Sequence, residues 1–523
     1  MFLFIKSQIS KVFIFFLLLF SVFFNQHYAN LGVFPIDTFL HFDAGYRILN
    51  GEHPFKDYWT MAAPLVDYLQ AFFFYFFGVS WKSYVLHASL LNALLTISTY
   101  FVLRNFNLNI YYSFFYSLLF SILAYPISGT PFIDHHAAFF SLLGVYSLLL
   151  AINNKNKFYC FLVPIFLGLG FFSKQVPSSY IILFIVFILV LYSLKERNFG
   201  YIKYSFLGAT LFIFVILTFG YLQEIQFSSF LDQYIFYPPT IGKERYENLH
   251  FGFRGIIGHF KFVYLAIIPL FFINIRNFFL DKKYIYHNDF FVFLILLLLT
   301  FSFILHQVLT KNQTFIFFLI PVLTAFSQIS LKKINFKFNN LLYLIIISLC
   351  LFAAVKYHLR FNENRKFHEL RNVNFQLSTN ADKIDEKLSG LNWITYDFKD
   401  NPIEEIKFIN QIKSHFESDS RNKIVITNYS FFSSILNEKT FSPSRVFAGD
   451  GTTNPMKNNK YAIKYKKLMI NLIKKNNISV IYIIAPLDST NIYDYFEKQC
   501  FKETSVLERL KSYEIKNCNE ING

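Results

Sequence analysis

Long apolar runs recur along this chain, and they constrain its fold more than any other feature. "KVFIFFLLLFSVFF" (residues 11–24) and "FFVFLILLLLTFSFIL" (residues 290–305) are two examples. A run of about 18 or more apolar residues is typical of a membrane-spanning helix. Lipid offers no hydrogen-bond partner to a bare backbone, so only helices and closed barrels can cross it. These runs are too long and too continuous for barrel strands, and they predict a polytopic α-helical membrane protein.

The composition agrees with a membrane protein. Hydrophobic residues make up 54% of the 523 residues and charged residues only 16%, whereas a soluble globular chain has about 25% charged residues. The net charge is +16. In a soluble protein this charge would suggest nucleic acid, but Lys and Arg that set membrane topology explain it here. We therefore expect membrane lipids, and no nucleic acid, as partners.

About eleven spans are expected from the apolar runs. They cover residues 9–26, 84–103, 110–127, 135–152, 157–173, 178–195, 201–222, 261–278, 289–309, 314–331 and 340–357.

The short connections between these spans indicate the orientation. Basic residues gather in one alternating set of them: Arg104, Lys155, Lys157, Lys195, Arg197, Lys203, Arg276, Lys282, Lys283, Lys332, Lys333 and Lys337. Short basic connections stay in the cytoplasm, so the N-terminus is expected there too. An odd number of spans then places the C-terminal region outside the cytoplasmic membrane of a bacterium.

The chain is expected to form two domains. Residues 1–357 form the membrane domain, with outer loops at 27–83 and 223–260. The apolar segment 64–78 is short and contains Asp67, which favours a helix at the membrane interface.

Residues 358–523 are rich in charge and are expected to form a small extracytoplasmic α/β domain. "NKIVITNYS" and "NISVIYIIAP" resemble buried strands, and "KYAIKYKKLMINLIKKN" resembles an amphipathic helix between them. Cys500 and Cys518 both lie in this domain, where an oxidising environment makes a disulfide between them plausible. Cys160 and Cys350 fall in spans and are expected to be packing residues.

Acidic residues are distributed unevenly. The first 357 residues hold thirteen Asp and Glu, of which ten fall on the predicted outer side and five of those between residues 37 and 67. A carboxylate near hydrocarbon needs water, a partner or a substrate. For Glu52, Asp67, Glu244 and Glu247 we expect ordinary solvated surface acids. Asp37 follows the first span and Asp134 opens the fourth, so both are candidates for a site at the membrane surface.

These residues resemble the C-type glycosyltransferase superfamily, which includes protein O-mannosyltransferases and bacterial lipid-A aminoarabinose transferases. In that superfamily an acid follows the first span, and a short helix, a "P-Y-x-D" turn and a Pro-led helix come next. Here the corresponding stretches are Asp37, "AGYRILNG", "PFKDY" and "APLVDYLQAFFFYFFG". "LGLGFFSKQVP" and "TKNQTFIFFLIP" resemble later motifs. Two departures are Thr38, where many members have a second acid, and "NQTF", where Arg or His-Tyr often stands.

The resemblance implies an inverting transfer of a sugar from a polyprenyl-phosphate carrier to a lipid, polysaccharide or protein acceptor. Asp37 would be the general base, with Asp43 as its rival within the same loop. Asp134 would correspond to the second acid of many bacterial members and could position the acceptor or the base. Lys174, beside Gln175, would face the phosphate leaving group, although a lysine that only fixes the span end is an equal alternative. Asp57 is a candidate for binding the substrate. His135 and His136 are candidates for contacts with the sugar hydroxyls, although two histidines that only lie at the membrane interface are an alternative. Arg245, Arg254 and Lys311 are further outer cations.

A metal site and other functions remain open at this point. Asp37, Asp134 and His135 could supply ligands to a divalent cation, which only some branches of the superfamily use, but no metal motif of fixed spacing is present. An O-antigen polymerase or ligase would rely on Arg-rich outer loops. A transporter or flippase would carry charged residues in the middle of its spans. Asp450 in "AGDGTT" is more readily explained as a turn residue than as part of an acceptor path.

Overall fold

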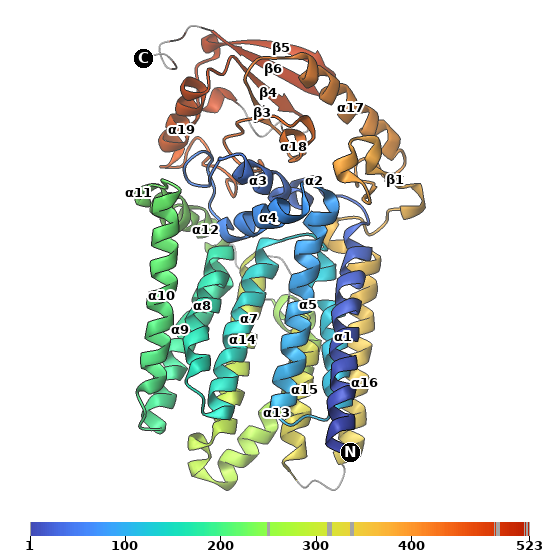
Figure 1. The fold of residues 1–523 in the computed structure, drawn as a ribbon, viewed down its shortest axis with the longest axis vertical. Helices are drawn as coiled ribbons and strands as arrows, with labels where there is room; N and C mark the ends of the chain where they lie inside the picture. Colours follow the sequence, from blue (N-terminus) through green and yellow to red (C-terminus); the bar gives the residue numbers. More distant parts are fainter. Residues whose placement is uncertain are drawn as a thin grey trace. The chain divides into compact units, whose positions relative to one another are not determined.

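The computed structural model describes residues 2–247, 252–310, 316–334, 339–485, 487, 492–516, 518 and 521 (Figure 1). By its internal contacts the chain divides into two compact units. The first unit contains Met1–Ala29, Val85–Ile216 and Leu249–Phe367. The second contains Asn30–Tyr84, Leu217–Asn248 and His368–Gly523. Whether residue 357 marks the end of the membrane domain stays a prediction.

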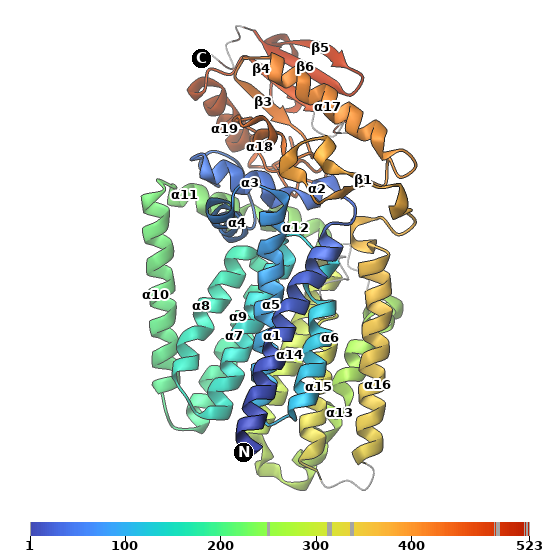
Figure 2. The ribbon, with the colours of Figure 1, turned by 45° about the vertical axis from the view of Figure 1, so that its right-hand side comes forward.

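The first unit is a bundle of helices that run alongside one another (Figures 1 and 2). Its main helices are α1 (Phe2–Ala29), α5 (Trp81–Asn105), α6 (Ile110–Leu123), α7 (Ile133–Asn154), α8 (Phe158–Ser173), α9 (Gln175–Lys195), α10 (Gly200–Leu222), α13 (His259–Leu280), α14 (Asn288–Thr310), α15 (Leu319–Lys332) and α16 (Asn339–His358), where α5 begins and α10 ends in the second unit.

Each predicted span overlaps one of these helices. Within the described part of the chain, nine helices are long and apolar enough to cross a membrane, while α8 and α15 are shorter. The chain is therefore a polytopic helical membrane protein. The predicted span at 314–331 begins in residues 311–315, which lie outside the described residues, as do Lys311 and the "NQT" of its motif.

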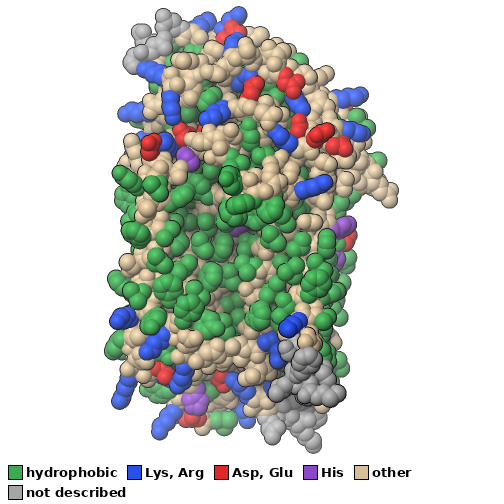
Figure 3. Space-filling view, viewed as in Figure 1, with side chains coloured by type: hydrophobic (Ala, Val, Ile, Leu, Met, Phe, Trp, Pro, Cys, Tyr) green, Lys and Arg blue, Asp and Glu red, His purple; other side chains and the backbone are tan. Residues whose placement is uncertain are grey.

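Burial distinguishes the central helices from the peripheral ones. In α7, 94% of the most apolar window is buried inside the structure, whereas in α10 the figure is 6%. The backbone of α10 nevertheless approaches α8 closely, because a Cβ atom added at Gly208 would lie only 2.0 Å from the carbonyl oxygen of Phe161. Hydrophobic side chains cover the helices of this unit between their ends (Figure 3). Exposed apolar side chains on a membrane helix are the ones that face lipid.

One end of the first unit carries the basic connections. Lys155 Nζ lies 3.3 Å from Glu196 Oε2, and Lys333 Nζ lies 2.6 Å from Asp289 Oδ1. Lys155, Glu196 and Asp289 lie in or beside the connections from α7 to α8, from α9 to α10 and from α13 to α14, and Lys333 follows the last residue of α15. We call this the basic end of the unit. Figure 3 shows Lys and Arg side chains gathered there, below the apolar band.

The second unit is built around a mixed sheet with the strand order β3-β4-β6-β5. β3 (Lys423–Ile426) pairs in parallel with β4 (Val480–Ile484), and α19 (Ala462–Lys475) connects them. β6 (Leu510–Ile515) pairs antiparallel with β4 and with β5 (Phe501–Leu507). Every residue of β3 and β4 is buried, as expected for a pair of parallel strands rich in Val and Ile. The two predicted strands and the helix between them are therefore confirmed.

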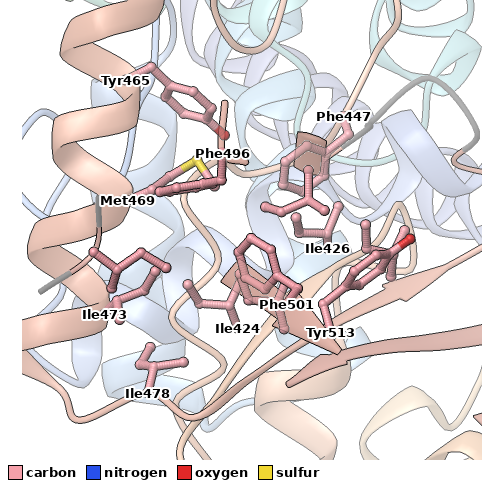
Figure 4. Close-up of a cluster of buried hydrophobic side chains, with 14 of the residues drawn as sticks. Ile424, Ile426, Phe447, Tyr465, Met469, Ile473, Ile478, Phe496, Phe501 and Tyr513 are labelled. Atoms are coloured by element: carbon pink, nitrogen blue, oxygen red, sulfur yellow. The ribbon is translucent and has the colours of Figure 1, made fainter. Parts of the chain in front are cut away.

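The core of this unit is an apolar cluster beneath α19 (Figure 4). It gathers side chains from α19, β3, β5 and β6, among them Tyr465, Met469, Ile473, Ile424, Ile426, Phe501 and Tyr513. Cys500 and Cys518 lie beside these residues and are joined by a disulfide, with Cα atoms 5.2 Å apart. Trp59 and Tyr237 also belong to the cluster. Two segments far from the C-terminus thus contribute to the same core.

Residues 30–84 form three helices within the second unit. They are α2 (Pro35–Thr38), α3 (Leu40–Leu49) and α4 (Pro64–Phe77), and α4 coincides with the segment predicted to be an interfacial helix. The backbone N–H of Trp59 donates to Pro443 O at 2.8 Å. In residues 217–248, α12 (Pro238–Glu247) follows Tyr237, whose hydroxyl donates to Gly451 O. Three remote segments therefore fold together in this unit, which a linear division of the sequence does not anticipate.

Candidate active site

Asp134 is the centre of a buried charged cluster in the first unit. It lies in the first turn of α7, after the extended residue Phe132, and is 4% exposed. Lys174 Nζ donates to both of its carboxylate oxygens at 2.8 Å. His306 Nε2, from α14, lies 2.9 Å from Oδ1. We call these three residues the Asp134 cluster.

Local structure explains why Lys174 can reach Asp134. Lys174 has an extended backbone (φ −161°, ψ 138°) at the end of α8, immediately before α9. Its side chain is 18% exposed, whereas that of Asp134 is 4% exposed. A buried carboxylate requires charged or hydrogen-bonding partners, and the first turn of a helix also favours a negative charge. The cluster therefore holds a carboxylate and an accessible ammonium group together at the ends of three membrane helices.

The structure brings together two of the predicted site residues, Asp134 and Lys174, and adds His306, which the sequence analysis missed. His306 falls inside the apolar run "SFILHQVLT". An ionisable side chain within a span is itself a signal of function, and that signal could have identified His306. Gln175 is half-buried at the start of α9.

His135 and His136 are both buried inside the first unit. His136 Nδ1 lies 2.7 Å from the hydroxyl of Tyr125, and its Nε2 lies 2.9 Å from Nε2 of His87. The ring of His135 stacks on Tyr125, with ring centroids 4.9 Å apart. These contacts are typical of histidines that pack a helix bundle.

Asp37, the predicted general base, belongs to the second unit. It lies in the short helix α2, whose first residue is Pro35, and its side chain is half-buried. Its backbone N–H donates to Phe34 O at 3.0 Å. Asp37 and Asp43 fall in separate helices, because Phe39 ends α2 before α3 begins.

Asp43 is more deeply buried than Asp37. It is 5% exposed, and its Oδ1 accepts a hydrogen bond from the hydroxyl of Ser433 in α18 (Phe432–Leu436). Its Oδ2 lies 3.9 Å from Arg47 Nη1. Burial raises the pKa of Asp43 to about 6, although the positive charge of Arg47 opposes the shift. Asp43 thus joins α3 to the C-terminal segment.

Glu52 and Asp67 correct an expectation. Both were expected to be solvated surface acids, but they are 6% and 0% exposed. Glu52 Oε2 accepts from Arg47 Nε at 2.7 Å. The carboxylate of Asp67 accepts from Arg445 Nη1 at 3.1 and 3.0 Å, and His41 Nδ1 lies 2.6 Å from its Oδ1. Both acids are buried within their unit and are held by cations, Arg47 and Arg445, whose contacts a loop sequence does not reveal.

Asp57 and Asp450 both accept hydrogen bonds from nearby backbone N–H groups. Asp57 Oδ2 accepts from the backbone N–H of His53 at 2.9 Å, and its Oδ1 accepts from Lys475 Nζ at 3.3 Å. Asp450 accepts from the backbone N–H of Thr452 at 3.0 Å and is exposed. Both are arrangements of turn residues.

The described residues contain no group of three or more His, Cys, Asp and Glu side chains arranged to hold a metal ion. A scan against protein-family models and a search of curated proteins each return no match.

Proposed function

We propose that this protein is an inverting glycosyltransferase that takes its sugar from a polyprenyl-phosphate donor. The acceptor is a lipid, a polysaccharide or a protein at the outer face of a bacterial cytoplasmic membrane. The observation that carries the proposal is the Asp134 cluster, with a carboxylate and a partly exposed ammonium group at the ends of three membrane helices. Apolar side chains of similar volume would stabilise a helix bundle equally well. Stability alone therefore does not explain this cluster.

The proposed reaction is a single displacement. The acceptor oxygen attacks C1 of the sugar, the bond from C1 to the phosphate oxygen breaks, and polyprenyl phosphate leaves with the electron pair. In the superfamily that the sequence resembles, the acid after the first span takes the proton of the acceptor hydroxyl, and Asp37 is the corresponding residue here. Lys174 stabilises the negative charge on the leaving phosphate, and Asp134 holds Lys174 in place.

Asp37 is a better candidate for the base than Asp43. The raised pKa of Asp43 would suit a base, but its side chain is buried inside the second unit and only 5% exposed. Asp37 is half-buried and lies directly after the first membrane helix. A base must reach its substrate, and partial exposure favours Asp37.

The orientation and the number of spans belong to the same proposal. The basic end of the first unit carries Lys155, Lys195 and Lys333 in or beside its connections, and short basic connections favour the cytoplasm. The eleven apolar helices would then all be spans, with the shorter α8 and α15 among them.

The positions of the charged side chains favour an enzyme over a transporter or flippase. In the described spans, charged side chains lie near the helix ends. For example, Asp134, Lys195 and Asp289 each lie in the first or last turn of a helix. A transporter places ionisable groups near the middle of the membrane. Charges at span ends suit chemistry at the membrane surface.

Incubating the protein in vesicles with a panel of radiolabelled polyprenyl-phosphate sugars tests the proposal. We expect one donor to release free polyprenyl phosphate and to label an acceptor. Movement of intact donor between the leaflets, without release of polyprenyl phosphate, would instead identify a flippase. An O-antigen polymerase or ligase would act on a pyrophosphate-linked glycan and would leave the monophosphate donors untouched.

A further inference from the structure

A pocket of about 330 Å³ opens at the basic end of the first unit. It lies between the end of α13, the start of α14 and the end of α15. Its polar lining consists of Arg276, Asn277, Tyr284, Asp289, Ser330 and Lys333.

The lining carries one positive charge in excess. Lys333 and Asp289 form an ion pair, with Nζ 2.6 Å from Oδ1. The hydroxyl of Tyr284 donates to Asn274 Oδ1 at 2.8 Å, so it is already satisfied within the unit. Among the residues that the structure describes, Arg276 forms no ion pair. Its guanidinium group therefore carries the excess positive charge that can bind a ligand.

The pocket borders on a surface that faces lipid. Phe272 and Phe279 are 63% and 79% exposed. They stand four residues before and three residues after Arg276 on α13, so the three side chains share one face of the helix. Apolar side chains this exposed on a membrane helix contact acyl chains. Arg276 therefore lies where acyl chains and polar groups meet.

We propose that this pocket binds the phosphodiester headgroup of an anionic membrane lipid. The Arg276 guanidinium pairs with the phosphate, and its planar fork suits two phosphate oxygens. Asn277 and Ser330 bind the headgroup hydroxyls, and the acyl chains lie along Phe272 and Phe279. The single excess charge matches a phosphodiester, which carries one negative charge. An arginine that only fixes the end of a span would show no preference between lipids.

This inference does not depend on the glycosyltransferase proposal, and lipid binding tests it without an activity assay. The full-length protein in detergent is titrated with phosphatidylglycerol or phosphatidylcholine, and native mass spectrometry counts the bound lipid. We expect phosphatidylglycerol to bind more tightly. Arg276→Gln should weaken it about tenfold or more, as loss of a charged hydrogen bond predicts.

A second variant tests the cavity separately from the charge. Ser330→Phe fills the pocket without changing a charge and should also weaken binding of phosphatidylglycerol. The matched control is Arg197→Gln, because Arg197 is an exposed arginine at the same basic end but outside the pocket. It should bind as the wild type does. Size-exclusion profiles and circular dichroism show whether each variant is folded.

Three results would overturn the proposal. Equal loss in Arg197→Gln and Arg276→Gln would identify a general attraction of basic residues to anionic lipid. Unchanged binding in both Arg276→Gln and Ser330→Phe would place the lipid elsewhere. If soluble glycerophosphoglycerol, the headgroup without acyl chains, competed as well as the lipid, the ligand would be a soluble phosphodiester.

Discussion

Each of the two units contains a buried aspartate held by one cation and one histidine. In the first unit, Asp134 is bound by Lys174 and contacts His306. In the second unit, Asp67 is bound by Arg445 and contacts His41. We call the latter set the Asp67 cluster. Each cluster pairs an aspartate with a histidine and a cation, which is lysine in one and arginine in the other. The clusters also differ in access, because Lys174 is 18% exposed and Arg445 only 8%.

The partners of the two cations explain that difference. Arg445 also donates to Ala62 O at 2.8 Å, so its guanidinium is committed to the segment that precedes α4. It ties residues 62–67 to the C-terminal part of the same unit. Lys174, in contrast, makes its hydrogen bonds to Asp134 and keeps part of its surface accessible. The comparison teaches that an aspartate held by a cation and a histidine can form a structural clamp or a candidate reactive group, depending on how accessible the cation is.

The largest effect is expected at the Asp67 cluster. Arg445→Met leaves the carboxylate of Asp67 buried without its main cation, which costs about 3–5 kcal/mol of unfolding free energy. The melting temperature should fall by about 10 °C. Tryptophan fluorescence reports it, because the chain's 3 tryptophans, Trp59, Trp81 and Trp393, all lie in the second unit.

The exposed Arg371→Met in the same unit is the matched control and should melt as the wild type does. If Arg445→Met also melted like the wild type, Arg445 would not be a structural clamp. The contrast between the Asp67 cluster and the Asp134 cluster would then not hold.

The next effect concerns Asp43 and pH. Burial raises the pKa of Asp43 from 3.8 to about 6. The folded state therefore binds this proton more tightly than the unfolded state, and the contribution of Asp43 to stability falls as pH rises from about 4 to about 6. The loss amounts to about 3 kcal/mol.

Asp43→Asn removes this titration. The wild type should therefore lose melting temperature relative to Asp43→Asn between pH 4 and pH 7, in the tryptophan signal. A constant difference between the two proteins across that range would show that Asp43 does not titrate there.

An activity effect of similar size is expected at the Asp134 cluster. Asp134→Asn keeps the shape but loses the ion pair with Lys174, and a misplaced catalytic group costs about 100-fold in rate. Sugar transfer should fall by that factor, while the tryptophan melt of the second unit stays unchanged. Asp281→Asn, an exposed acid of the first unit, serves as the control. Full activity in Asp134→Asn would make this cluster structural, like that of Asp67.

The smallest effect is expected at an exposed ion pair. Lys464 is bonded to Asp232, and their side chains are 54% and 24% exposed. Exposed pairs contribute less than about 1 kcal/mol. Lys464→Gln should therefore shift the melting temperature of the second unit by no more than about 3 °C. A larger shift would mean that exposure does not predict how much an ion pair contributes to stability in this protein. The difference between the two clusters would then need another explanation.

The sequence predicted the parts of the fold that local patterns encode. Apolar runs located the membrane helices, and buried Val and Ile runs located β3 and β4. The helix α17 (Pro402–Ser418) was missed, although Pro402 and the acids Glu404 and Glu405 in its first turn are start signals.

The pairings within each cluster could not be predicted in the same way. Asp67 and Arg445 are 378 residues apart, and Asp134 and His306 are 172 residues apart. No local pattern reports that such residues meet, because tertiary packing decides it. Asp134 and Lys174 were recognised as candidates one at a time, whereas their ion pair appeared only in the structure.

The most direct test of the central claim is the transfer rate of Asp37→Asn. Asn keeps the size of the side chain but cannot accept the proton. Asp400→Asn, an exposed acid of the same unit, is the matched control. With both variants expressed to the same level, the account predicts transfer about 100-fold or more slower for Asp37→Asn and unchanged for Asp400→Asn. Wild-type transfer by Asp37→Asn would contradict the assignment of Asp37 as the base.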